Sequence, residues 1–87
     1  MGLVLTLRPH EKIRIGKAVA YVELSDDIDS IPMNVDGTVF YVTDKKKVEI
    51  LLDVYVSAGF YNEDFQQYRV VFDAPREIKI FREELLR

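Results

Sequence analysis

The sequence predicts a mainly β protein, and three of its features lead to that fold class. Aromatic and β-branched residues dominate the apolar side chains, and these residue types favour strands. Isoleucines alternate with mostly charged residues at 12–16 and again at 77–81, the pattern of a strand with one exposed face. Asp36-Gly37 is a typical turn between two strands. We therefore expect short strands joined by turns.

The size and composition of the chain limit the kind of protein that it can form. Its 87 residues fit one domain over 1–87. A chain of this size buries only about 60–65% of its unfolded surface, so a dimer would add useful stability. The absence of cysteine excludes disulfides and thiolate metal sites. We find no long apolar run and no signal-peptide pattern, so we expect a cytoplasmic protein that does not enter a membrane.

The first third of the chain predicts three strands. Leu3–Leu7 is an apolar run that suits a strand buried on both faces. The alternation at 12–16 predicts a second strand, and Ala18–Leu24 predicts a third.

The middle of the chain predicts a loop followed by a hairpin. Ser25–Pro32 breaks the strand pattern and is typical of a loop. Thr38–Val42 and Val48–Val56 then predict two strands around the charged segment 43–47. The three lysines of that segment would hinder pairing with another sheet edge.

The last third predicts a strand, a turn, a second strand and a short C-terminal helix. Tyr68–Phe72 is the first of these strands. Pro75 fixes its own φ and keeps Ala74 extended, which predicts a turn before the alternating strand at 77–81. Glu83-Glu84-Leu85 begins the helix, because acidic residues in a first turn favour the helix dipole.

Formal charge is distributed unevenly along the chain. Residues 1–17 carry four basic groups and one acid, and residues 66–87 carry five basic groups and four acids. Residues 18–65 carry ten acids and three lysines. The net charge of −3 is therefore an average over two basic ends and an acidic middle. The acidic middle either keeps an extra hairpin soluble or binds a basic partner.

Both ends of the chain carry motifs that resemble one family. Residues 73–85 are Asp-Ala-Pro-Arg-Glu-Ile-Lys-Ile-Phe-Arg-Glu-Glu-Leu, and residues 3–8 and 11–16 are Leu-Val-Leu-Thr-Leu-Arg and Glu-Lys-Ile-Arg-Ile-Gly. They are similar to the patterns x-A-P-R/K-E-V/I-x-V/I-H-R-E-E-I and L-V/I-L-S/T-R-R/K-x-G-E-x-I/L-x-I-G of the carbon storage regulator family (CsrA/RsmA). Its members are small bacterial translational repressors.

The resemblance covers about residues 3–24 and 66–87, so residues 25–65 look like a central insertion into a CsrA-like five-stranded unit. It implies an interlaced homodimer in which the first strand of one chain lies beside the last strand of the other. The third strand of the family matches either Ala18–Leu24 or Leu52–Gly59. The first alternative places the insertion after that strand, and the second places it before.

The resemblance also implies an RNA site that binds GGA-type loops of mRNA or of a small regulatory RNA. Binding would block the ribosome or alter the stability of the message, and two sites on one dimer would raise avidity. Arg82 would be a principal contact, since a guanidinium suits phosphates and guanine edges. The residues that match the family site are Leu5, Thr6, Arg8, Ala74, Pro75, Ile80, Phe81 and Arg82.

Each of these residues also has a structural interpretation. Arg82 could pair with a neighbouring glutamate, Phe81 could serve packing, and the others could belong to the core and turns. Three positions depart from the family pattern: Phe81 replaces His, Leu7 replaces Arg and His10 replaces Gly. Phe81 keeps a face on which a base can stack but loses a donor. Leu7 removes a phosphate contact.

The sequence shows no set of residues for catalysis, a cofactor or a metal. His10 is the only histidine, and the acids near Asp26 lack the spacing of a calcium-binding loop. We therefore predict a non-enzymatic RNA-binding protein with no cofactor. The alternative is a protein-interaction module of the same fold whose acidic insertion binds a protein partner or masks the RNA site. The position of the insertion relative to Arg82 distinguishes the two.

Overall fold

The computed structural model describes residues 2–24, 30–62 and 67–83, and these form nine strands and no helix. The predicted β class is therefore confirmed. The strands are β1 (Gly2–Leu7), β2 (Ile13–Ile15), β3 (Ala18–Val22), β4 (Ile31–Val35), β5 (Thr38–Val42), β6 (Val48–Leu51), β7 (Val54–Asn62), β8 (Gln67–Asp73) and β9 (Ile80–Arg82).

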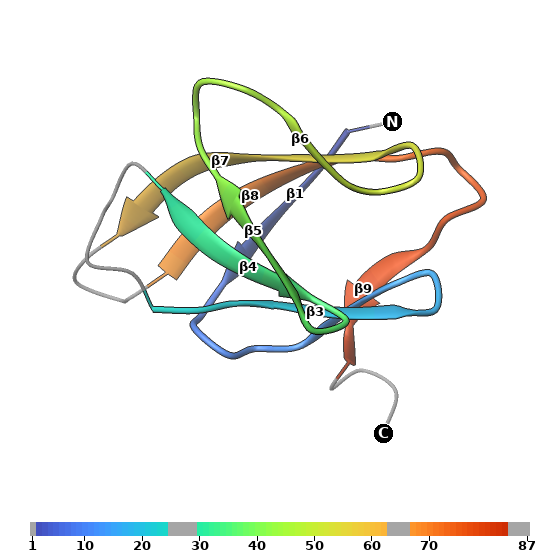
Figure 1. Cartoon of the computed structure of the whole chain (residues 1–87), viewed down its shortest axis with the longest axis horizontal. Helices are drawn as coiled ribbons and strands as arrows, with labels where there is room; N and C mark the ends of the chain where they lie inside the picture. Colours follow the sequence, from blue (N-terminus) through green and yellow to red (C-terminus); the bar gives the residue numbers. More distant parts are fainter. Residues whose placement is uncertain (1, 25–29, 63–66, 84–87) are drawn as a thin grey trace.

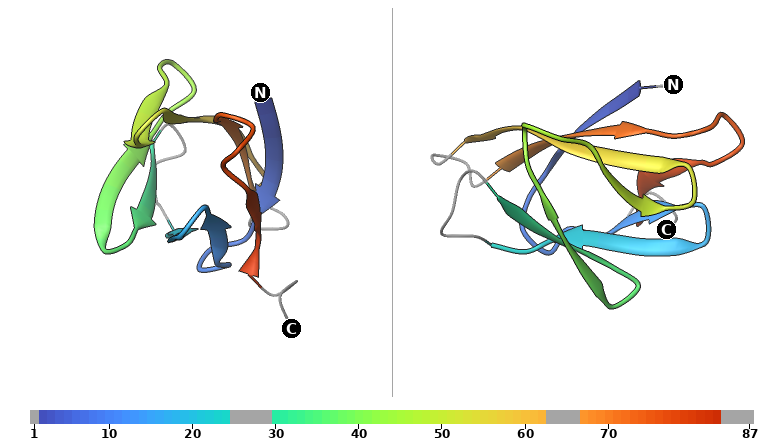
Figure 2. Two further views of the ribbon diagram at one scale, coloured as in Figure 1. Left: turned by 90° about the vertical axis from the view of Figure 1, so that its right-hand side faces the viewer. Right: turned by 45° about the horizontal axis from the view of Figure 1, so that its top comes forward.

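The strands form two antiparallel sheets that pack face to face (Figure 1). One sheet has the order β1-β8-β7-β6, and the other has the order β5-β4-β3-β2-β9. The chain passes between the sheets three times, after β1, after β5 and after β8. The edges of the two sheets approach each other on both sides, β1 beside β9 and β5 beside β6 (Figure 2). The result is a flattened barrel.

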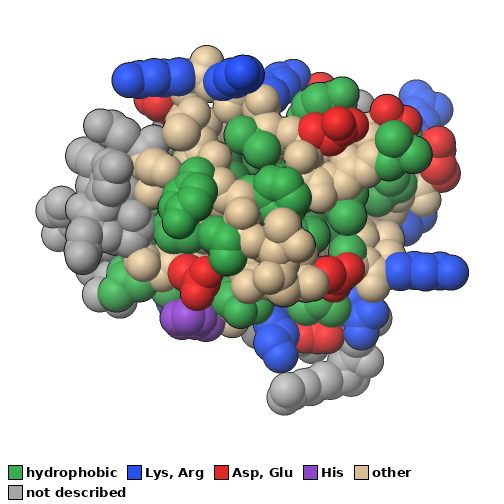
Figure 3. Space-filling model, viewed as in Figure 1, with side chains coloured by type: hydrophobic (Ala, Val, Ile, Leu, Met, Phe, Trp, Pro, Cys, Tyr) green, Lys and Arg blue, Asp and Glu red, His purple; other side chains and the backbone are tan. Residues whose placement is uncertain are grey.

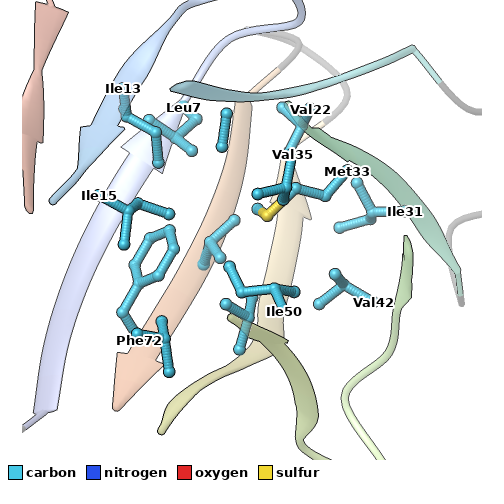
Figure 4. Close-up of a cluster of buried hydrophobic side chains, with 14 of the residues drawn as sticks. Leu7, Ile13, Ile15, Val22, Ile31, Met33, Val35, Val42, Ile50 and Phe72 are labelled. Atoms are coloured by element: carbon cyan, nitrogen blue, oxygen red, sulfur yellow. The ribbon is translucent and has the colours of Figure 1, made fainter. Parts of the chain in front are cut away.

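The space between the sheets is filled by apolar side chains from both (Figure 4). Every second residue of β2, β3, β4 and β8 is buried, because alternate side chains of a strand point to opposite faces. Tyr68, Phe72 and Leu7 are the largest fully buried side chains. Among the described residues no charged residue is buried, so burial of apolar surface is the main source of stability.

The turn at Asp36-Gly37 joins β4 to β5 as predicted. Both residues have positive φ, 50° and 92°, as the tight turn of a two-residue hairpin requires. The Gly37 amide donates to Asn34 Oδ1 at 2.8 Å, and the Val19 amide donates to Asp36 Oδ1 at 3.0 Å. The second contact fixes this turn to β3.

The hairpin predicted in the middle of the chain is wrong. β5 pairs with β4, and β6 pairs with β7 in the other sheet. The predicted strand Val48–Val56 is interrupted by a turn at Leu52-Asp53, where Asp53 has a φ of 62°. The predicted loop is also too long, because Ile31–Val35 forms β4. Pro32 near the start of that strand hid an alternation whose three apolar residues are all buried.

Two predictions for the end strands need correction. β1 is an edge strand with Leu3 and Val4 exposed, and only Leu7 is buried, so it is not covered on both faces. β9 starts at Ile80 because Arg76–Ile78 forms a turn, in which the Ile78 amide donates to the Pro75 carbonyl at 3.1 Å. Most of the predicted C-terminal helix lies outside the described residues.

The predicted insertion is a structural part of both sheets. The segment 25–65 supplies β4, β5, β6 and β7, and its buried side chains belong to the same core as those of the two ends. In this chain β1 pairs with β8 and β9 pairs with β2. Pairing of the end strands between two chains stays a prediction.

One matched pair of substitutions on β5 tests whether the insertion belongs to the cooperative core. Val42 is 1% exposed and Val39 is 42% exposed. Val42→Ala should lower the free energy of unfolding by about 2 kcal/mol, since it removes two buried methyl groups. Val39→Ala should cost less than about 1 kcal/mol. Urea unfolding measures both, and equal losses would contradict this assignment of the core.

Candidate nucleic-acid interface

The edge strands β1 and β9 meet through the side chain of Arg82. β9 pairs with β2, where Arg82 lies opposite Ile13. The ribbon of β9 runs close to that of β1 (Figure 2). Arg82 Nη2 donates to the Thr6 carbonyl oxygen at 2.6 Å. The arginine side chain remains 31% exposed. A guanidinium has five N–H donors, so this contact leaves donors that a ligand could use.

Glu11 holds Arg82 from the other side. Arg82 Nε lies 3.5 Å from Glu11 Oε2. The glutamate is fixed by the turn that follows β1, because the Arg8 amide donates to Glu11 Oε1 at 3.2 Å and the Glu11 amide donates to the Arg8 carbonyl at 3.1 Å. The arginine is thus positioned before any ligand arrives, which reduces the entropy lost on binding.

A second ion pair lies on the opposite face of the β2–β9 pair. Arg14 on β2 pairs with Phe81 in the strand register, and its Nη2 lies 3.4 Å from Glu83 Oε1. The Arg14 Nε is buried without a hydrogen-bond partner. Besides the two ion pairs, Arg8 and Lys12 lie close to them in the sequence, so these six residues carry a formal charge of +2. The region is cationic, but weakly so.

A shallow depression of about 250 Å³ lies at the other end of β1 and β9. Its lining is mainly apolar, with two cations at the rim. The lining residues are Gly2, Leu3, Ala74, Pro75, Arg76, Ile78, Lys79 and Ile80. A flat apolar surface with nearby cations suits the face of a nucleobase and its phosphate.

One carboxylate beside this depression is neutralised by a lysine. Asp73 ends β8 directly before Ala74, and Lys47 Nζ lies 3.0 Å from Asp73 Oδ2. The hydrogen bond and the charge of Lys47 lower the pKa of the Asp73 carboxyl below its ordinary value of 3.8. The lysine reduces the repulsion that this carboxylate would exert on a phosphate.

The structure brings most of the predicted RNA-contacting residues to one edge of the molecule. Thr6 and Arg82 touch directly. Ala74, Pro75 and Ile80 line the depression. The remaining residues lie on β1, directly after it or on β9: Leu5 packs partly against the core, Phe81 is half-buried and Arg8 is exposed.

Several features of this surface were not predicted. Glu11 was expected only as part of a motif, although its spacing of three residues from Arg8 is the signal of a side chain that caps a turn. The partner of Arg82 is Glu11, whereas the sequence suggested Glu83 or Glu84. Leu7 is fully buried, so this position belongs to the core and reaches no ligand.

The other candidate ligands lie elsewhere. The His10 ring packs at a tilt on Tyr21, with centroids 5.8 Å apart, and its amide donates to the Val22 carbonyl at 2.7 Å. The acids at 26–29 lie outside the described residues. Within 2–24, 30–62 and 67–83, no three histidine or carboxylate side chains gather as metal ligands.

Comparison of the chain with protein-family models, with curated proteins and with solved structures finds no match. The described residues contain no helix that is long and apolar enough to cross a membrane.

The pair of Lys47 and Asp73 makes a prediction for pH dependence. Lys47→Gln should raise the pKa of the Asp73 carboxyl toward 3.8, as followed by NMR. A depressed folded pKa stabilises the protein above the unfolded pKa of about 3.9, and this contribution is lost as pH falls through the folded pKa. The variant should therefore lose stability at pH 6 but not at pH 2. Equal losses at both values would mean that the lysine acts through packing.

Proposed function

We propose that the chain is an RNA-binding post-transcriptional regulator, which binds GGA-type loops of mRNA in the cytoplasm and represses translation or alters message stability. It makes and breaks no bond. The observation that carries the proposal is the contact between Arg82 of β9 and the Thr6 carbonyl of β1. It joins the two motifs on which the resemblance to the carbon storage regulator family rests, although 75 other residues separate them in the sequence.

The chemistry of this edge supports a nucleic-acid ligand. The planar Arg82 guanidinium is held between β1 and Glu11. Such a group can donate two parallel hydrogen bonds to a phosphate or to the edge of a guanine. The apolar depression at the other end of β1 and β9 offers a surface for an unstacked base. Sequence-specific RNA recognition uses loops with such splayed bases, whereas a duplex would present only its backbone and shallow groove.

The backbone at two positions also supports the resemblance. His10 and Gly16 both have positive φ, 67° and 61°. Glycine is the residue that adopts this conformation without strain. The family pattern has glycine at both positions, so the unusual His10 occupies a conformation that suits the typical residue. The ring contact of His10 with Tyr21 offsets part of the conformational strain of its left-handed backbone.

The position of the insertion favours RNA over the alternative protein-interaction module. The polar contacts of Arg82 within the described residues come from Thr6 and Glu11, and neither belongs to 25–65. The insertion forms the body of both sheets and leaves the arginine side chain partly exposed. On the face shown in Figure 3, acidic and basic side chains are interspersed rather than gathered into one acidic patch.

Substitution of Arg82 tests the proposed site. Arg82→Ala should weaken the binding of a GGA-loop RNA hairpin by about 1–3 kcal/mol, because it removes the central cation and donor of the surface. Arg82→Gln retains a donor for the Thr6 carbonyl and separates a folding defect from the loss of the RNA contact. Titrations at two salt concentrations measure the affinity and the number of phosphate contacts.

Lys46→Ala is the matched control, since it removes the same charge from the turn between β5 and β6. It should change the affinity by less than about twofold at physiological salt, where charges are screened over about 8 Å. Equal losses for Lys46→Ala and Arg82→Gln would reveal non-specific attraction. Unchanged affinity in a folded Arg82→Gln variant would remove Arg82 from the site and favour a protein partner.

A further inference from the structure

The two sheets repeat one strand order, although the amino-acid sequence shows no visible repeat. The first sheet is β1-β8-β7-β6. Let β1 be exchanged with β5, β2 with β6, β3 with β7, and β4 with β8. This exchange turns the order of the first sheet into β5-β4-β3-β2. That is the order of the second sheet without β9. The same exchange turns the β2–β3 hairpin into the β6–β7 hairpin.

The strand registers obey the same exchange. In the outer pairs of the two sheets, Leu7 of β1 pairs with Tyr68 of β8, and Val42 of β5 pairs with Ile31 of β4. All four side chains are buried. Equivalent strands therefore point equivalent residues into the core.

The inner pairs give the same result. Ala20 of β3 pairs with Val35 of β4, and Val56 of β7 pairs with Phe72 of β8. These four side chains are also buried. Apart from β9, the described strands form two topologically equivalent halves, which enclose one core.

The strand β9 breaks this equivalence. It pairs with β2 at the edge of the second sheet. Because β6 is the counterpart of β2, a counterpart of β9 would pair with β6. In the part of the chain that the structure describes, however, the first sheet ends at β6. There β6 instead contacts β5, the counterpart of β1. One side of the barrel therefore has β9 between β1 and β2, and the other closes without such a strand.

The cluster around Arg82 consequently exists once in the described residues. The counterpart of Thr6 follows from the register. Thr6 precedes Leu7 on β1, and Tyr41 precedes Val42, the counterpart of Leu7, on β5. The counterpart of Thr6 is therefore Tyr41. Tyr41 is 65% exposed. Within the described residues no counterpart of β9 pairs with β6, so no arginine takes the place beside Tyr41 that Arg82 takes beside Thr6.

We propose that one chain is a self-contained molecule with a single RNA-binding cluster, and that it takes one RNA loop without a second copy of itself. This inference rests on the proposed function for the nature of the ligand. It replaces the two-chain assembly that the resemblance implies, because both sheets and both halves of the core come from one chain. The consequence is regulation without avidity, since one particle cannot hold two loops of the same message.

The test combines the mass of the particle with two RNA probes. Light scattering should give 10.1 kDa for the free chain at micromolar concentration. Native mass spectrometry should give one chain per GGA-loop hairpin. An RNA with two such loops should bind two chains, with an affinity per loop within about twofold of the single hairpin, whereas a bivalent particle would gain about 10²–10⁴-fold.

Tyr41→Ala distinguishes a chain with one RNA-binding cluster from a chain with a second cluster at the counterpart position. It should leave the affinity and the stoichiometry unchanged, while Arg82→Gln should weaken the only binding event. A free particle of twice the mass, or a gain in affinity on the two-loop RNA, would overturn the single-chain assembly. Two hairpins per chain would overturn the single cluster. Absence of RNA binding from a particle of 10.1 kDa would instead overturn the proposed function and the RNA cluster with it.

Discussion

The pairing of β9 with β2 is the interaction on which the candidate site depends. After β8 the chain leaves one sheet, turns at Arg76–Ile78 and joins the edge of the other sheet with only three residue pairs. Arg82 stands at the end of this short strand. The pairing sets its side chain against β1, whose register with β8 fixes Thr6 in turn. Both sheets therefore have to form before the cluster exists.

The sequence predicted the ends of the chain better than its middle. Strands at 3–7 and 68–72 were found because both segments are mostly apolar. The Asp36-Gly37 turn was found because its residues suit positive φ. β4 was missed because Pro32 is typical of a loop and hid the alternation of the three buried apolar residues of this strand. The pairing of β5 was missed because alternation fixes which face is buried but not which strand lies alongside.

The candidate site was predictable in its residues but not in its arrangement. The motifs at both ends indicated Arg82 and Thr6, but only the folded chain shows that they touch. The role of Glu11 depends on the turn after β1, in which Glu11 Oε1 also accepts a hydrogen bond from the Arg8 amide. The repeated strand order was invisible because equivalent positions need only be apolar, and Leu7, Val42, Tyr68 and Ile31 satisfy this requirement without being alike.

The central claim is that RNA binds along the edge formed by β1 and β9. NMR chemical-shift mapping of the amides during titration with a GGA-loop hairpin tests it most directly. The account predicts that the largest changes fall on β1, on the turn from Arg8 to Glu11 and on residues 74–83, with small changes on β4 and β5. Changes concentrated on the outer face of β4 and β5, where Tyr41 is exposed, would contradict it.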